Sequence, residues 1–190
     1  MRASKLGDVY CIKVPNGYKL VQWAYRIPKY GDYIRVFDGL YEEIPHDIKK
    51  IVYSKHSYIT AFHVSKAYRI GLAQWIGNFE VPKEYPFPEY GLSFNIDFCT
   101  HITESILVTN SPLSSHHRER YYVASVCDLP KEYRDITLVS GYVTPDWLLY
   151  WFDTGFDLQH PEKYFPGPNS EAVMQKYSDI INLFINGRTN

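Results

Sequence analysis

The chain has 190 residues, of which 45% are hydrophobic and 22% are charged, and its formal net charge at pH 7 is −1. This length suffices for one sizeable hydrophobic core, so we expect a single domain over residues 1–190. A general nucleic-acid-binding domain is normally clearly basic, and the sequence therefore does not favour a nucleic-acid partner. Aromatic residues make up 17% of the chain, including 18 tyrosines, and this favours β-structure.

The three cysteines, Cys11, Cys99 and Cys127, are widely spaced. A secreted disulfide scaffold has an even and denser set. The N-terminal segment contains no apolar signal-peptide core, and no apolar run approaches the ~18 residues that a membrane span needs. The sequence therefore predicts a cytoplasmic protein with reduced thiols, no membrane partner, and a buried structural role for Cys127.

The first half of the chain predicts short antiparallel strands, over residues 9–14, 18–25, 32–37, 58–64 and 72–82. The first two flank the sequence PNG, which is typical of a hairpin turn. A short helical turn is predicted after Pro45, and a short helix ending at Gly71.

The middle of the chain predicts further strands, although their alternation of apolar and polar residues is imperfect. They are the segments LSFNIDFC, SILVTN, YYVASVCDL and DITLVSGYV, over residues 92–99, 105–110, 121–129 and 135–143.

Two helices are predicted near the C-terminus, at residues 144–154 and 170–186. In the first, Thr144 is the expected N-cap, Pro145 the first helical residue and Gly155 the end. The second is amphipathic, with Ser170 as a capping residue and one apolar stripe, formed by Val173, Tyr177, Ile180, Ile181 and Phe184. Many short strands with a few helices predict an α+β fold, mainly an antiparallel sheet, with a C-terminal amphipathic helix.

An acidic corner follows the third predicted strand: four carboxylates and no Lys or Arg lie between Asp38 and Asp47. Glu42, Glu43 and Asp47 are candidates for an acid/base pair, for a partner-binding surface, or for a solvated turn. A solvated turn or a partner surface is favoured over catalysis, because charged turns between elements are commonly just solvated.

A second candidate surface lies in the segment WLLYWFDTGFD. Here Trp147 and Tyr150 fall on a different side of the helix from Leu148 and Phe152. A helix that is apolar all round is buried or meets a partner. Core burial is the slightly favoured reading, and the alternative is a protein interface formed by Trp147 and Tyr150 with Asp153 and Asp157, which are candidate partner-binding residues.

Motifs for the common catalytic and cofactor sites are absent from the sequence. It has no G-x-G pair, no G-K-[ST] loop, no G-x-S-x-G elbow, no H-E-x-x-H and no C-x-x-C. The adjacent His116 and His117 are a weak metal candidate, because neighbouring residues of a strand point to opposite faces. We therefore predict no enzyme activity, no cofactor and no metal site.

The run R-V-F-D-G-x-Y-x-E-x-P from Arg35 to Pro45, and the run G-x-x-x-x-x-G-N-x-x-x-P from Gly71 to Pro82, resemble the immunity protein 26 family. The opening KLGDVYCIKVPNGYKLVQ is similar to the usual start of that family. The resemblance covers roughly residues 5–82. It implies a cytoplasmic bacterial protein that binds and neutralises the C-terminal domain of a cognate toxin from a polymorphic-toxin or contact-dependent growth inhibition system, with nucleases among the expected targets. It supplies no catalytic residues.

Two other function classes remain as alternatives. One is a nucleic-acid-binding β-barrel with a basic face from Lys5, Lys13, Lys19, Arg26 and Lys29. The other is a small enzyme without a recognisable motif, which would need convergent titratable groups with perturbed pKa values in a pocket.

Overall fold

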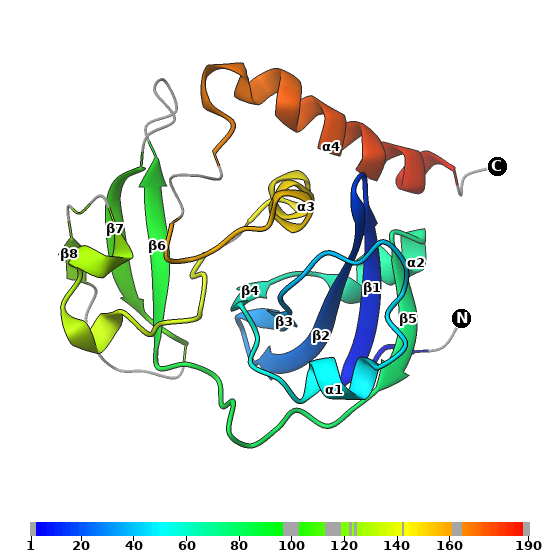
Figure 1. Ribbon diagram of the computed structural model, residues 1–190, viewed down its shortest axis with the longest axis horizontal. Helices are drawn as coiled ribbons and strands as arrows, with labels where there is room; N and C mark the ends of the chain where they lie inside the picture. The colour runs from blue at the N-terminus through cyan, green and yellow to red at the C-terminus, as the bar shows by residue number, and fades with distance from the viewer. Residues whose placement is uncertain are drawn as a thin grey trace.

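Two antiparallel β-sheets form the framework of the protein, seen in a computed structural model (Figure 1). The structure describes residues 3–96, 103–112, 119–121, 123, 125–141, 143–160 and 165–187. The first sheet has five strands in the order β4-β3-β2-β1-β5: β1 (Asp8–Val14), β2 (Gly17–Ile27), β3 (Gly31–Val36), β4 (Tyr58–Ala61) and β5 (Ala73–Asn78). The second has the order β6-β7-β8: β6 (Tyr90–Ile96), β7 (Thr103–Asn110) and β8 (Glu119–Tyr121).

The helices are α1 (Ile48–Val52), α2 (Val64–Ile70), α3 (Pro145–Thr154) and α4 (Ser170–Asn186). The structure thus confirms the predicted α+β fold with a mainly antiparallel sheet and a C-terminal helix. In α4, Met174 and Tyr177 are buried, and the rest of the predicted stripe packs half-buried against the same core.

The first sheet is covered on both faces. Alternate residues of β1 belong to two different apolar clusters: Tyr10 and Ile12 to the larger one, and Val9 and Cys11 to a smaller one completed by Val52 of α1. A strand that is buried on both faces reads as a nearly continuous apolar run. This is why the alternation in the sequence is imperfect although the strand prediction is correct.

An extended segment at residues 137–140 joins the two sheets. Its Leu138 and Val139 form parallel bridges to Ile59 of β4 and Leu92 of β6. Four backbone hydrogen bonds of 2.7–2.8 Å hold it in place. The segment lies in the middle of the strand predicted over residues 135–143. In place of that strand, the structure has only the two bridges at Leu138 and Val139 among the described residues. The larger cluster takes residues from both sheets, which supports the predicted single domain, although that remains a prediction.

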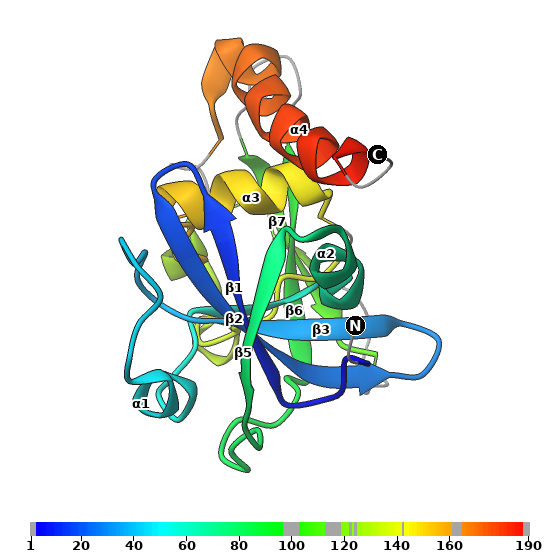
Figure 2. The ribbon, with the colours of Figure 1, turned by 90° about the vertical axis from the view of Figure 1, so that its right-hand side faces the viewer.

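Helix α3 lies between the two sheets and is crossed by α4 (Figures 1 and 2). Its residues from Leu148 to Asp153 are all buried. The helix ends at Gly155, whose φ of 79° is left-handed, and the following turn stacks Phe156 on Trp151 with ring centroids 4.1 Å apart. The predicted cap residue Thr144 occupies the N-cap position without a side-chain hydrogen bond.

Four predictions for local structure are corrected. Of the described residues in the strand predicted over 121–129, Tyr121 ends β8 and Val126–Asp128 form a 3-10 turn, and β4 ends at Ala61 instead of residue 64. Cys127 is exposed, whereas Cys11 is buried and burial raises the pKa of its thiol to about 11. The N-cap of α4 is Asn169, and Ser170 is its first residue.

Candidate functional site

A polar cleft of about 500 Å³ lies where the segment after β3 meets the segment after α3. Its walls are formed by four stretches that are distant in sequence, together with Lys19 and Phe152: residues 38–40, 55–57, 135–137 and 155–159. The cleft brings Asp38, at the start of the predicted acidic corner, into one site with Asp157 of the second predicted surface.

The lip of the cleft is fixed by a contact between Asp38 and Ser57. The Ser57 hydroxyl donates a short hydrogen bond to Oδ1 of Asp38, and the backbone N–H of Ser57 bonds to the carbonyl of Val36 at 2.8 Å. The Asp38 carbonyl in turn accepts from the Tyr41 hydroxyl at 3.2 Å. These contacts hold one carboxylate at a defined position beside the cleft.

Lys19 is a buried amine in this cleft, with 5% of its surface exposed. Its Nζ donates to the Gly39 carbonyl at 3.0 Å. Burial lowers the pKa of Lys19 to about 8, and the charge of Asp38 partly opposes that shift. A buried ammonium stabilised by a single carbonyl costs folding free energy, which is more typical of a functional site than of a packing position.

Behind the cleft lies Arg35, a fully buried arginine that forms no ion pair with a carboxylate among the described residues. Its guanidinium lies over the rings of Phe37 and Tyr85, at 5.0 and 4.8 Å from their centroids. It donates four hydrogen bonds, to His56 Nδ1 at 3.2 Å, Gln22 Oε1 at 2.9 Å, Val52 O at 3.1 Å and Ser54 O at 2.9 Å. Desolvation lowers the pKa of Arg35. The arginine thus ties β2, β3, α1 and the chain before β4 together.

His56 connects this network to the cleft, which it lines. Because its Nδ1 accepts from Arg35, the proton of the neutral ring is on Nε2, and that atom has no hydrogen-bond partner among the residues that the structure describes. Burial and, next, the positive charges of Arg35 and Lys55 lower the pKa of His56 to about 4. The imidazole is therefore neutral at pH 7, and the Ser57 hydroxyl is bonded to Asp38 instead of to it.

The shifted pKa of His56 predicts a specific acid sensitivity. The unfolded chain has a histidine pKa near ~6.5, so between about pH 6.5 and pH 4 the unfolded state binds more protons. The free energy of unfolding should therefore fall as the pH is lowered through that window, by roughly 3 kcal/mol at most. Denaturant titrations at several pH values should show a flatter pH dependence for His56→Gln. His63→Gln, at an exposed histidine, is the matched control and should keep the parental slope.

The three carboxylates predicted in the acidic corner are all exposed. Asp47 is the N-cap of α1, where Oδ1 accepts from the backbone N–H of Lys50 at 3.2 Å. Glu43 lies 4.0 Å from His46, and both side chains are solvated. Glu42 and Glu43 lie a few residues after residues 38–40 of the cleft in the chain, and neither lines the cleft itself.

The second predicted surface is divided by the structure. Asp157 is exposed and lines the cleft. Trp147 is half-buried in the first turn of α3, against Tyr150 and Phe165. Tyr150 and Asp153 are buried, with 8% and 7% of their surfaces exposed, and we therefore remove these two from the candidate surface.

Ser57 and His56 were not predicted as site residues, and Lys19 was named only for the alternative basic face. His56 and Ser57 belong to a short polar run before β4 and Lys19 lies in β2, and only the fold brings the three to one cleft. Arg35 had a recognisable signal: it is the one charged residue in the run YIRVF, whose positions are all buried. A charged residue within such a run indicates either an edge strand or a buried hydrogen-bond network. At Arg35 it is the buried network.

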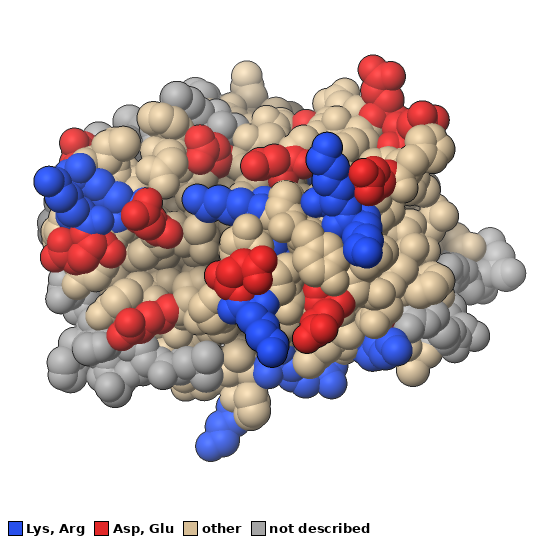
Figure 3. All heavy atoms as spheres, turned by 60° about the horizontal axis from the view of Figure 1, so that its bottom comes forward, with Lys and Arg blue, Asp and Glu red and all other residues tan. Residues whose placement is uncertain are grey.

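The basic face required for a nucleic-acid-binding barrel is not formed by the five residues proposed for it. Lys19 is buried, and Arg26 is paired with Asp32 at 2.8 Å. Lys13 lies beside the β1–β2 turn and Lys29 lies in the β2–β3 connection, so the two are at opposite ends of β2. Seen from the side on which α1 lies, acidic and basic side chains are interspersed, and neither sign forms a continuous field among the described residues (Figure 3).

Two further features are absent from the part of the chain that the structure describes. No group of three or more His, Cys, Asp or Glu side chains there is arranged to hold a metal ion. None of the described helices combines the length and the apolar character that crossing a membrane requires. The candidate pair His116 and His117 lies outside the described residues.

Comparisons with known proteins returned no matching family model, no matching curated protein and no matching solved structure.

Proposed function

We propose that this protein is an immunity protein, which binds and neutralises the C-terminal domain of a cognate toxin in the cytoplasm of the cell that makes both. The observation that carries the proposal is the carboxylate-bearing cleft. Asp38, Asp135 and Asp157 line it together with Lys19 and Lys55, and the exposed Glu42 and Glu43 follow in the chain soon after Asp38. These groups lie in loop segments, which the two sheets and α3 hold in place.

Besides its charged groups, the cleft offers apolar surface for contact with a protein. Its floor includes apolar side chains, Phe152 and Phe156 among them, beside the carboxylates. Apolar contacts ringed by charges are typical of the centre and rim of protein interfaces. Because charges of both signs are mixed over the neighbouring face, selection of a basic partner depends on these local carboxylates.

The feature that favours the alternative of a small enzyme is Lys19, an amine with a lowered pKa in a cleft. Catalysis also needs a positioned acid or base next to the nucleophile. His56 is neutral and bound to Arg35, and Ser57 donates to Asp38. No nucleophile–base pair is thus assembled among these residues, and binding without turnover is the better-supported function.

A charge-reversal series tests the proposal. We expect simultaneous Lys substitutions at Glu42, Glu43, Asp47 and Asp157 to slow association with the toxin domain encoded beside this chain by roughly tenfold at low salt. The effect should shrink at about 0.5 M salt, because exposed charges are screened there. Stopped-flow or surface-plasmon measurements give the rate, and co-expression shows whether the variant still protects cells.

The matched control reverses Glu171 and Asp179, two exposed carboxylates of α4 that lie outside the cleft. This control variant should associate at the parental rate. Equal rates for both variants would remove the cleft as the contact surface. A parental protein that gives no protection against the toxin would overturn the proposed function itself.

A further inference from the structure

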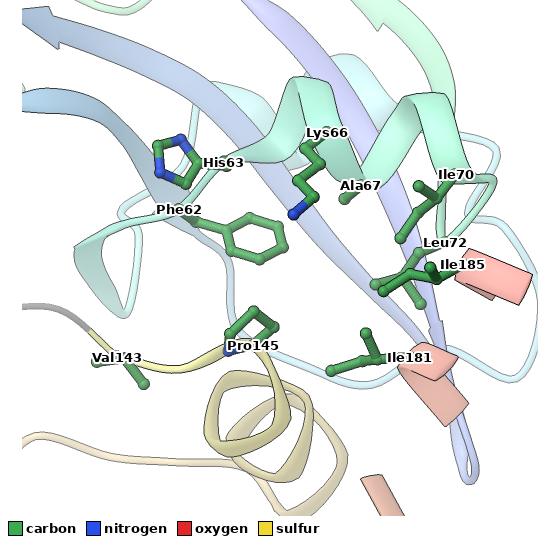
Figure 4. A pocket seen from close by; sticks show the side chains of 10 residues that line it. All are labelled: Phe62, His63, Lys66, Ala67, Ile70, Leu72, Val143, Pro145, Ile181 and Ile185. Carbon is green, nitrogen blue, oxygen red and sulfur yellow. The ribbon is translucent and has the colours of Figure 1, made fainter. Parts of the chain in front are cut away.

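A second pocket, sharing no residue with the cleft, lies between α2, the start of α3 and the C-terminal end of α4 (Figure 4). Its volume is about 140 Å³. Its walls are almost entirely apolar and come from these three helices and their flanking segments: Phe62, Ala67, Ile70, Leu72, Val143, Pro145, Ile181 and Ile185.

The end of α4 leaves the pocket open to solvent. Ile185 lines the pocket with 41% of its surface exposed, and Leu183 nearby on the helix is 73% exposed. The floor, in contrast, is well packed, since Phe62, Ala67 and Leu72 are buried. A cavity of ~150 Å³ with apolar walls accommodates one benzene-sized molecule, so the size of this pocket fits a single six-membered ring or a short branched chain.

A single positively charged side chain, Lys66, lies among the described residues that line the pocket. Lys66 of α2 is the only Lys, Arg, Asp or Glu among the lining residues, and its amine end points toward the pocket's side chains (Figure 4). No carboxylate lies within ion-pair distance of Lys66 among the described residues. The pocket therefore presents an apolar wall beside an unneutralised ammonium group.

We propose that this pocket binds a small monocarboxylate whose apolar part is one ring or a short branched chain. The apolar part fills the space between Phe62, Leu72 and Ile181, and the carboxylate stays at the solvent-exposed mouth beside Lys66. A carboxylate is preferred over a neutral or cationic group because Lys66 is the only Lys, Arg, Asp or Glu among the described residues that line the pocket. For a ligand of about nine heavy atoms in an open pocket, a Kd on the order of a millimolar is expected.

Amide-resolved NMR titration of the whole chain with benzoate, and with benzamide as its neutral counterpart, tests the site. Benzoate should shift resonances of α2, residues 143–145 and the end of α4, with benzamide binding more weakly at the same place. Lys66→Gln, at an exposed position, should weaken benzoate binding by about two- to fivefold and leave benzamide unchanged. Lys49→Gln, on α1, is the control and should change neither.

Three outcomes would overturn the proposal. One is the absence of shifts at benzoate concentrations tenfold above the expected Kd. Another is equal binding of benzoate and benzamide with no effect of Lys66→Gln, which would show an apolar site without selection for carboxylate. The third is self-association through the exposed end of α4, seen as a dimer that Ile185→Asp dissociates and that benzoate does not affect.

Discussion

We expect Asp153→Asn to lower the free energy of unfolding by about 2–4 kcal/mol, because hydrogen bonds to a charged acceptor are worth ~1.5–3 kcal/mol each. Asp153 accepts three of them: from the backbone N–H of Asn16 at 2.8 Å, from Asn16 Nδ2 at 3.1 Å and from the Tyr177 hydroxyl at 2.9 Å. These bonds join the β1–β2 turn and α4 to α3 (Figure 2). In asparagine one acceptor oxygen becomes an NH₂ donor, which faces existing donors.

Denaturant unfolding followed by tryptophan fluorescence measures this loss. Asp157→Asn is the matched control, because Asp157 is exposed and its oxygen accepts only from the nearby Gln159 N–H at 2.9 Å. The free energy of unfolding of that control should lie within ~0.5 kcal/mol of the value for the parent protein. Tyr177→Phe removes one of the three bonds to Asp153 and should cost about 1.5–3 kcal/mol. Equal unfolding midpoints for Asp153→Asn and Asp157→Asn would contradict the structural role of Asp153.

The largest expected loss of stability, about 3–5 kcal/mol, follows Arg35→Lys. Lysine keeps the charge, but a single ammonium cannot reach four acceptors that surround a planar guanidinium. The Val52 carbonyl and the Gln22 side chain would be left buried without their donor, and the part-buried Ser54 carbonyl would lose its bond as well. An unsatisfied buried polar group costs ~1–3 kcal/mol, so even partial rearrangement leaves a large deficit.

Arg26→Lys provides the comparison at a solvated arginine. Arg26 is exposed and bonds to Asp32 at 2.8 Å, and such surface pairs contribute ~0–1 kcal/mol. Each substitution lowers the free energy of unfolding by an amount measured under the same conditions. The difference between the two losses gives the contribution of the buried hydrogen-bond network of Arg35. If Arg35→Lys cost no more than Arg26→Lys, the four hydrogen bonds would not stabilise the fold. Because His56 lines the cleft and bonds to Arg35, the same substitution should also disturb the candidate site.

Local patterns predicted the first half of the chain well. The PNG turn fixes the β1–β2 hairpin, and Gly71 and Gly155 end α2 and α3 in the left-handed conformation. Each of these signals acts within a few residues of the structure that it specifies. The region around residues 121–143 was predicted less well, because residues 137–140 become strand-like only by pairing with β4 and β6.

The candidate site likewise combines features that the sequence predicted with features that depend on distant segments. The sequence indicated Glu42, Glu43, Asp47 and Asp157 as surface charges, and they are exposed. It equally indicated Asp153 as a partner-binding charge, although Asp153 lies inside the predicted helix and Asp157 beyond its end. The fold buries Asp153 because Asn16 and Tyr177, from distant segments, supply its donors.

The sequence by itself determined the elements of this protein: its hairpin, its helix ends, the amphipathic character of α4 and the acidic loop after β3. Such features depend on backbone sterics and on neighbours a few residues away. Tertiary structure alone decided which polar side chains are buried, and thereby placed Lys19, Ser57 and His56 in one cleft and Lys66 at the other pocket. The physical reason is that desolvation and hydrogen-bond satisfaction depend on groups brought together from separate elements, which no local window of sequence contains.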